Sequence, residues 1–332
     1  MCGIAGLLYP DGRSPQQEQF TPMLEVLHPR GPDAQEVWLK PGLGLAHTRL
    51  SILDLSPTGA QPMHSPDEQL HITYNGEVYN APELAHELRQ AGYTFRGHSD
   101  TEVLLVGYEH WGLEGLLNRI RGMYAFCLVD ERQGKAHLVR DRFGKKPLYM
   151  LELSEMGEAG PGLAFASDIR CLMALGVPLT LDLGSVDYYL CELAMPQPRT
   201  IWEEVRQLPP GHFLSYDLNS GKFSLERYWE LSYETNAQIS AQEAQEESER
   251  LLRQAVRRRT LSDVPVGAFL SGGVDSGLVT ALFAQESGEP VRTFTVGFTQ
   301  PEFDERGPAR ELAERYHTQH TEIVAEPNML EY

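Results

Sequence analysis

The stretch Cys2-Gly3-Ile4-Ala5-Gly6-Leu7-Leu8-Tyr9, which follows Met1 directly, is the part of the sequence that decides the fold. Its small and apolar residues predict a strand over 2–9. Removal of Met1 would leave a thiol and a free α-amine on Cys2. Because the reference pKa of an α-amine is about 8 and that of a thiol about 8.5, the amine can accept the thiol proton. The stretch therefore predicts a nucleophile that carries its own base. The alternative is that Cys2 is only a small residue at the start of a buried strand.

Three polar groups further along the chain suit such a nucleophile. Asn75-Gly76-Glu77 follows an apolar run and offers a side-chain amide and a backbone amide that could stabilise an oxyanion, although an Asn-Gly hairpin turn is the alternative. Arg49 is a cation in an apolar strand and requires an anion, either a substrate carboxylate or a structural partner. Ser99-Asp100-Thr101-Glu102 predicts the start of a helix, with Ser99 or Asp100 as its cap.

Together with other short runs, these residues give a family resemblance. The runs are Cys2-Gly3-Ile4-Ala5-Gly6, Arg30-Gly31-Pro32-Asp33, Arg49-Leu50-Ser51-Ile52, Gly59-Ala60-Gln61-Pro62-Met63, Asn75-Gly76-Glu77-Val78-Tyr79-Asn80, Ser99-Asp100-Thr101-Glu102, Arg140-Asp141-Arg142-Phe143-Gly144-Lys145-Lys146-Pro147-Leu148-Tyr149 and Phe165-Ala166-Ser167-Asp168. Their order resembles that of the N-terminal-nucleophile glutaminase domain of glutamine-hydrolysing asparagine synthetases. Each run alone is a weak signal, but their shared order is not expected by chance.

The resemblance implies an α+β fold, the αββα sandwich of N-terminal-nucleophile enzymes, and a set of roles. Cys2 would be the nucleophile, and Asn75 and Gly76 the oxyanion donors. Arg49 would hold the α-carboxylate of glutamine in a pocket that includes Leu50 and Ile52, while Glu77 and Asp100 would face its α-ammonium. The chain departs from the family at Pro29, where His is usual. Because proline lacks a backbone donor, this departure bears on how the loop near the pocket closes.

The pattern of apolar runs and turns predicts two domains and a linker. Strands over 43–50, 70–74, 123–130 and 136–140 and helices over 82–91 and 102–111 belong to a glutaminase domain over 2–205. A connector with a short strand pair is expected over 206–240. The remainder, 241–332, predicts a capped helix over 240–261, strands over 264–270 and 291–298, and helices over 278–285 and 308–316. That order indicates the beginning of a parallel α/β sheet.

A second candidate site lies in this C-terminal part. Leu270-Ser271-Gly272-Gly273-Val274-Asp275-Ser276 joins a predicted strand to a predicted helix, so its amides and hydroxyls converge on a helix N-terminus, where anions bind. It lacks the Gly-Lys-Ser/Thr of a Walker A loop and resembles the pyrophosphate loop of enzymes that split ATP into AMP and pyrophosphate. Asp275 would help to hold Mg²⁺. The run around Val296 is similar to the same synthetase domain, which would place Val296 near the adenine.

The resemblance implies a reaction that uses both sites. Cys2 would hydrolyse glutamine to glutamate and ammonia, ATP would adenylate aspartate, and ammonia would give asparagine with AMP and pyrophosphate. Because the acceptor-binding residues of the family are missing before Tyr332, we expect a truncated synthetase domain and glutaminase activity alone. Two alternatives stay open: an amidotransferase for another carboxylate acceptor, and a non-catalytic binding protein.

The composition of the chain indicates which classes of partner and which cellular compartment to expect. A net charge of −19 repels phosphate backbones and anionic lipids, so we expect neither nucleic acid nor membrane as a partner. The four cysteines have no disulfide or zinc spacing, and the start of the chain has no signal-peptide pattern, so a cytoplasmic protein is expected. The exposed edges of an unfinished sheet predict a tendency to associate, with a homodimer as one outcome.

Overall fold

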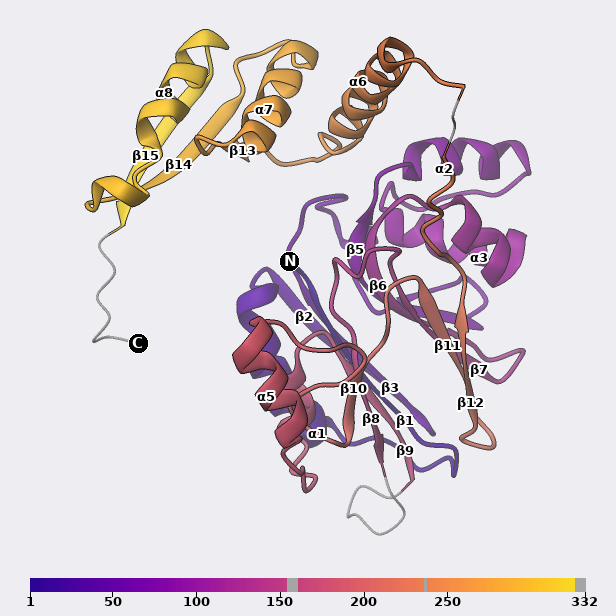
Figure 1. Ribbon diagram of the computed structural model, residues 1–332. Helices are drawn as coiled ribbons and strands as arrows, with labels where there is room; N and C mark the ends of the chain where they lie inside the picture. The colour runs from indigo at the N-terminus through magenta and orange to yellow at the C-terminus, as the bar shows by residue number, and fades with distance from the viewer. Residues whose placement is uncertain (154–160, 236–237, 326–332) are drawn as a thin grey trace. The chain divides into compact units, whose positions relative to one another are not determined.

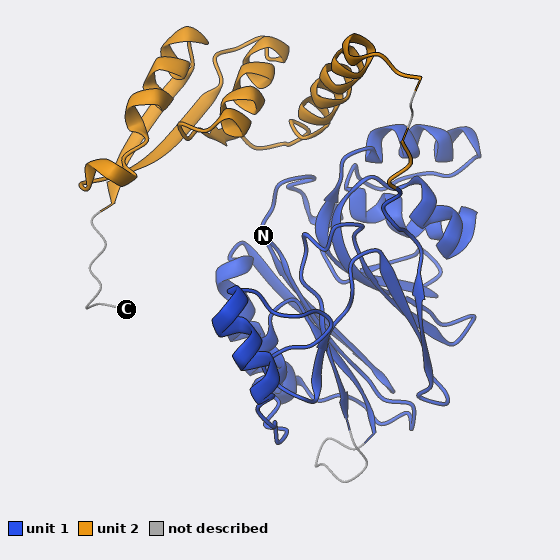
Figure 2. Cartoon of the chain, viewed as in Figure 1, with its two compact units in different colours: residues 1–232 blue, residues 233–332 orange. Residues whose placement is uncertain are grey.

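The structure, a computed structural model, describes residues 1–153, 161–235 and 238–325 (Figure 1). The chain divides into two compact units, residues 1–232 and 233–332 (Figure 2). Residues 326–332, on which the expected end of the second domain falls, lie outside the described part. Among the described helices, none combines the length and the apolar character that crossing a bilayer requires.

Two antiparallel sheets form the frame of the first unit. The first sheet has the order β10 (Val205–Gln207), β8 (Tyr149–Leu153), β9 (Gly162–Ala166), β1 (Gly3–Leu8), β3 (Leu43–Arg49) and β2 (Ala34–Lys40). The second has the order β12 (Phe223–Arg227), β11 (His212–Asp217), β7 (Lys135–Arg140), β6 (Gly122–Asp130), β5 (Leu70–Val78) and β4 (Met63–His64). The predicted strand at the start of the chain is therefore a central strand, between β9 and β3.

Helices cover the outer face of each sheet. In β6, Ala125 and Cys127 pack into the cluster between the sheets, whereas Phe126 packs with the helices α2 (Ala81–Gln90) and α3 (Asp100–Arg119). This alternation follows from the two-residue period of a strand. Helices α1 (Gln17–Leu27) and α4 (Ile169–Met173) pack on the other sheet. The layers are thus helix, sheet, sheet and helix, which confirms the predicted αββα fold. Further elements of the unit are η1 (His28–Arg30), η2 (Pro57–Gly59) and α5 (Leu183–Glu192).

The first unit extends beyond the boundary predicted at residue 205. The sequence predicts a connector over 206–240, but its strand pair, β11 and β12, belongs to the second sheet, where β11 pairs with β7. Alternate side chains of β11 are buried on opposite faces: Phe213 packs with the helix side and Leu214 between the sheets. β11 is therefore part of the core, whereas β12 is an exposed strand at the edge of the sheet. The division between the units follows Ser232.

Two element boundaries matter for the site. The strand predicted over 70–74 continues to Val78, so Asn75, Gly76 and Glu77 lie within β5 and pair with β6 rather than forming a hairpin turn. The helix predicted over 102–111 begins at Asp100 and ends at Arg119, with a kink at Gly112 (φ 69°). Ser99 caps it by accepting a hydrogen bond from the Glu102 N–H at 3.3 Å.

The second unit contains a three-stranded parallel sheet in the order β13 (Gly267–Phe269), β14 (Arg292–Phe298) and β15 (Gln319–Ala325). Its helices are α6 (Ala241–Arg258), α7 (Val274–Glu286), η3 (Pro301–Phe303) and α8 (Arg306–Arg315). This order matches the predicted parallel α/β pattern. However, the strand predicted over 264–270 is only three residues long, because pairing with β14 is limited to Gly267–Phe269.

Candidate active site

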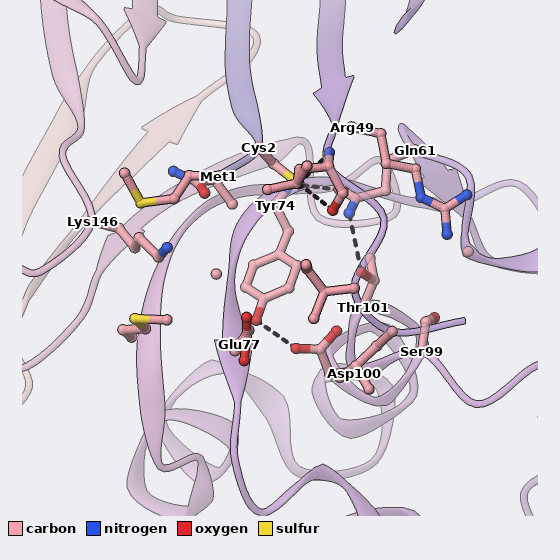
Figure 3. A pocket seen from close by; sticks show the side chains of 17 residues that line it. Met1, Cys2, Arg49, Gln61, Tyr74, Glu77, Ser99, Asp100, Thr101 and Lys146 are labelled. Atoms are coloured by element: carbon pink, nitrogen blue, oxygen red, sulfur yellow. Dashed lines mark hydrogen bonds between the residues drawn. The ribbon is translucent and has the colours of Figure 1, made fainter. Parts of the chain in front are cut away.

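A cavity of about 220 Å³ lies where β1, β3, β5 and α3 meet in the first unit (Figure 3). The side chains around it come from segments far apart in the sequence. They are Met1, Cys2, Arg49, Leu50, Ile52, Leu53, Gly59, Gln61, Tyr74, Asn75, Gly76, Glu77, Ser99, Asp100, Thr101, Met123 and Lys146. The structure therefore brings all the glutamine-site residues predicted from the sequence to one cavity.

The Cys2 thiol is held against the backbone of Leu50. Its Sγ accepts a hydrogen bond from the Leu50 N–H at 3.4 Å and donates to the Leu50 carbonyl at 3.6 Å. Burial raises the pKa of the thiol, while the Leu50 N–H and the nearby positive charge of Lys146 act to lower it. The Cys2 carbonyl accepts a hydrogen bond from Arg30 Nε at 3.2 Å. Arg30 lies in the turn η1 together with Pro29, so the departure from the family pattern is part of the turn that supports Cys2.

Asn75 is a buried amide without a partner. Its side chain is 1% exposed, and neither Oδ1 nor Nδ2 has a hydrogen-bond partner among the described residues. Such a group costs free energy, so native proteins rarely keep one without a use. Gly76 follows it where no side chain fits, because a Cβ there would lie 2.4 Å from the Met123 carbonyl oxygen.

Two carboxylates form the anionic side of the cavity. Asp100, at the start of α3, accepts hydrogen bonds from the Tyr74 hydroxyl at 2.7 Å and the Val78 N–H at 2.9 Å. Burial raises the pKa of Asp100, whereas these hydrogen bonds act to lower it. Burial and the charge of Asp100 both raise the pKa of Glu77. A substrate ammonium would relieve both effects, because an opposite charge favours the ionised carboxylates.

Arg49 borders the cavity but is bonded to its own loop. Its guanidinium donates to the carbonyls of Asp54 and, at 3.2 Å, of Ser56. Figure 3 shows the guanidinium pointing away from Cys2. Gly59 leaves room for it, since a Cβ at Gly59 would lie 2.3 Å from Arg49 Nη2. The carbonyls of Asp54 and Ser56 thus fix the position of the Arg49 guanidinium beside the cavity.

Sequence reasoning missed several residues of the site. Gln61 joins β5 to α3, because its Oε1 accepts from the Tyr74 N–H at 2.7 Å and its Nε2 donates to Thr101 Oγ1 at 3.1 Å. Lys146 is 4% exposed and lines the same cavity. The run from Arg140 to Tyr149 contained a signal for Lys146, since it places several charges next to apolar residues. Gln61 lies in the run Gly59–Met63, which supports the family resemblance but assigns this side chain no role.

The second predicted site lies in the other unit, at the N-terminus of α7. The Gly273 N–H donates to Ser271 Oγ at 3.2 Å, and the Ser271 N–H donates to Ser276 Oγ at 3.1 Å. The Gly272 N–H donates to a carboxylate oxygen of Glu305 at 3.3 Å. The loop therefore already accommodates one anionic oxygen at its amides, which agrees with phosphate binding.

The other residues predicted for nucleotide binding differ in their surroundings. Leu270 is buried under α8, while Val296 in β14 is 46% exposed. Asp275 is an exposed residue in the first turn of α7. Within the described part of the chain, no group of three or more His, Cys, Asp and Glu side chains could hold a metal ion. Asp275 would therefore have to share a Mg²⁺ ion with the oxygens of a ligand.

Comparisons with known proteins identify the families that the chain resembles. Residues 1–229 match the glutamine amidotransferase domain family, and residues 247–331 match the asparagine synthase family. Asparagine synthetase (glutamine-hydrolyzing) 1 of Bacillus subtilis is 32% identical over 94% of this chain and 48% of its own length. Asparagine synthetase (glutamine-hydrolyzing) 3 of the same organism is 31% identical over 90% of this chain and 48% of its own length. This chain thus spans about half the length of these relatives.

A solved structure supports the fold alone. Glutamine phosphoribosylpyrophosphate amidotransferase from B. subtilis superimposes with a TM-score of 0.51 at 17% identity, over 99% of this chain and 69% of that one. The family matches and the relatives confirm the resemblance predicted from the sequence. The chain therefore belongs to the asparagine synthetase-type family of glutamine amidotransferases.

Proposed function

We propose that the first unit hydrolyses glutamine to glutamate and ammonia, with Cys2 as the nucleophile after removal of Met1. One observation carries this proposal: the buried, unpartnered amide of Asn75 lies in the same cavity as the Cys2 thiol. A buried amide that has no hydrogen-bond partner in the described structure is free to donate to an oxygen that becomes negative only during the reaction. Gly76, whose backbone lies beside it in β5, would supply the second donor.

The reaction follows from the chemistry of these groups. The thiol proton passes to the α-amine of Cys2, and the sulfur attacks the side-chain amide carbon of glutamine. The amide oxygen becomes an oxyanion, which Asn75 Nδ2 and the Gly76 N–H would stabilise. The C–N bond then breaks, the nitrogen takes the proton from the ammonium and leaves as ammonia, and a thioester remains. Water hydrolyses the thioester to glutamate and restores the thiol.

The charges around the cavity support glutamine as the substrate. We propose that Glu77 and Asp100 face the α-ammonium of glutamine and that Arg49 holds its α-carboxylate, with Leu50 and Ile52 beside the side chain. This assignment places opposite charges against each other in a buried site, where an unpaired charge would be costly. It also gives a reason for the presence of Glu77 and Asp100 in the same cavity as Arg49.

The second unit supports a further proposal about the whole protein. We propose that the Ser271–Ser276 loop binds the phosphates of ATP, that Asp275 shares Mg²⁺ with them, and that Val296 lies near the base. Bound ATP would turn a carboxylate of aspartate into an acceptor for ammonia. The Glu305 oxygen at the Gly272 amide supports an anion at this loop. This chain spans about half the length of its relatives, and we propose asparagine formation as the reaction that would use both sites.

The test compares Cys2→Ser with Cys191→Ser, a matched control at an exposed cysteine in α5. Glutamate and ammonia release from glutamine is measured for each purified chain, and the intact mass shows whether Met1 has been removed. We expect Cys2→Ser to lower kcat by about 10³-fold or more with an unchanged melting temperature, and Cys191→Ser to match the parent. Equal ammonia release from Cys2→Ser and the parent would refute the proposal. Parallel reactions with ATP and aspartate show whether the chain itself forms an amide.

A further inference from the structure

Lys146 is a buried cation in the cavity to which the reaction described above assigns no role. Its side chain is 4% exposed and belongs to the wall of the cavity. Figure 3 shows its ammonium on the side of Met1 and Glu77, directed toward the interior of the cavity. A lysine is rarely buried unless an anion compensates its charge. The question is therefore which anion this ammonium serves.

The backbone of Lys146 is fixed from both sides by buried charged groups. The Asp141 carboxylate accepts hydrogen bonds from the N–H groups of Tyr124, Phe143, Lys145 and Lys146 at 3.2, 3.1, 3.0 and 2.9 Å. Arg140 Nε donates to the Lys146 carbonyl at 2.9 Å, and its Nη2 donates to the Gly144 carbonyl at 2.8 Å. Arg140 and Asp141 are themselves buried, so the loop is held rigidly in place.

This arrangement fixes the backbone from which the Lys146 ammonium extends into the cavity. Asp141 uses its charge on main-chain N–H groups, whereas Arg140 also donates from Nη1 to Gln197 Oε1 at 3.1 Å and to the Leu208 carbonyl at 2.6 Å. Of the residues that these bonds hold, Lys146 is the one that lines the cavity. Burial lowers the pKa of Lys146, and the neighbouring Glu77 and Cys2 act to raise it. The effect is mutual, because Lys146 also favours the ionised forms of Cys2 and Glu77.

We propose that Lys146 is a positioning residue of the glutamine site, whose ammonium stabilises the negatively charged sulfur of Cys2 and orients Glu77 toward the substrate. This inference rests on the proposed function, which it deepens. The fixed charge acts through Cys2 and Glu77 and takes no part in bond breaking. A preorganised charge of this kind is effective because it costs no rearrangement during the reaction.

Other charged groups act on the same sulfur and ammonium and must be included. The N-terminal amine and Asp100 act on the sulfur, and Arg30, Glu77 and Asp141 act on the Lys146 ammonium. Asp33 acts on the N-terminal amine, and Arg49 and Tyr74 line the same cavity. Because these groups include several carboxylates, removal of Lys146 leaves more negative charge near the sulfur. Ionisation of the thiol then requires a higher pH.

The experiment measures alkylation of Cys2 by iodoacetamide as a function of pH, with the N-terminal peptide quantified by mass spectrometry. We compare Lys146→Met, Lys146→Gln and Lys146→Arg with Lys145→Met, which changes the exposed neighbour in the same loop. The two neutral variants should move the alkylation midpoint up by about one pH unit and lower kcat for glutamine below that midpoint by about tenfold. Lys146→Arg should restore the parent profile, and Lys145→Met should not change it.

An unchanged alkylation profile in a folded neutral variant would overturn the proposal. Lys146→Gln keeps a polar side chain at this position, so it serves as the second neutral variant if Lys146→Met does not fold. Alkylation requires no glutamine. The neutral variants could differ from the parent in alkylation as expected while the parent itself releases no ammonia from glutamine. This outcome would refute the proposed function and leave the role of Lys146 in thiol ionisation intact.

Discussion

Asn75 illustrates how a single residue can serve activity at the expense of stability. We predict that Asn75→Ala lowers kcat for glutamine by about 10²–10³-fold, because one oxyanion donor is lost. The same change should leave the melting temperature equal or higher, since two buried atoms without hydrogen-bond partners disappear. Steady-state kinetics and thermal unfolding test both effects.

The matched control for Asn75 is Thr73→Ala, at a buried position in the same strand. Thr73 Oγ1 donates a hydrogen bond to the Ala46 carbonyl at 3.0 Å, so its removal should cost about 1 kcal/mol of stability and leave kcat near that of the parent. If Asn75→Ala kept full turnover, the oxyanion role would be wrong. If it instead lost stability as Thr73→Ala should, the amide would have an undetected structural partner.

Single residues were predictable from the sequence where their chemistry is unusual for their surroundings. Cys2, Arg49 and Asp100 were recognisable because a reactive or charged group stands in a motif, and the structure places them at one cavity. Gln61 was not, because its bonds to Tyr74 and Thr101 depend on the meeting of distant segments. Arg49 was foreseen as a cation near the site, but its bonds to the carbonyls of its own loop were not.

At the scale of elements, α3 connects helix capping to substrate binding. Its first residue, Asp100, lines the cavity, and Ser99 caps the helix through the Glu102 N–H. We predict that Ser99→Ala lowers the free energy of unfolding of the first unit by about 1 kcal/mol and raises KM for glutamine, because the start of the helix is less well held. Urea unfolding followed by tryptophan fluorescence reports on this unit, since Trp38, Trp111, Trp202 and Trp229 all belong to it.

Ser240→Ala provides the comparison for Ser99, because Ser240 caps α6 in the second unit with the same type of bond, at 3.2 Å from the Glu243 N–H. It should leave both KM and the tryptophan transition as they are in the parent. An unchanged KM in Ser99→Ala would show that the cap does not position Asp100.

Elements were predictable where the local pattern decides them and not where pairing does. The apolar run ending at Tyr74 indicated a strand, but its continuation through Asn75, Gly76 and Glu77 depends on β6 lying alongside. Similarly, β11 and β12 have the sequence pattern of an isolated strand pair. They join the sheet because β11 pairs with the edge of β7 that β6 leaves free. In α3, the non-helical backbone of Gly112 (φ 69°) interrupts the helix next to the predicted end at residue 111, and the pattern did not reveal the second helical stretch that continues to Arg119.

At the scale of the whole first unit, buried neutral histidines predict acid sensitivity. Burial lowers the pKa of His47 to about 3, and burial together with neighbouring charges lowers those of His64 and His137 to about 4. An unfolded histidine has a pKa near 6.5, so between pH 6.5 and 4 the unfolded chain binds more protons than the folded one. The stability that these residues contribute is therefore complete above pH 6.5 and is lost as the pH falls toward 4.

We expect the free energy of unfolding to drop by roughly 1–3 kcal/mol for each fully buried histidine between pH 7 and 4, measured by urea titration at several pH values. His86→Gln, on the exposed face of α2, should keep this pH dependence. His137→Gln should reduce it, because one group that takes up a proton on unfolding is gone. A stability that does not change over this range would contradict the burial of these rings in neutral form.

The loop at α7 has one further consequence. The Glu305 carboxylate lies 3.3 Å from the Gly272 nitrogen and supplies the loop with an anion from the protein itself. If the loop binds phosphate as proposed, the phosphate has to displace this side chain from the Gly272 N–H. The Glu305 carboxylate would then compete with the phosphate for this amide, and Glu305→Gln should tighten phosphate binding as measured by calorimetry.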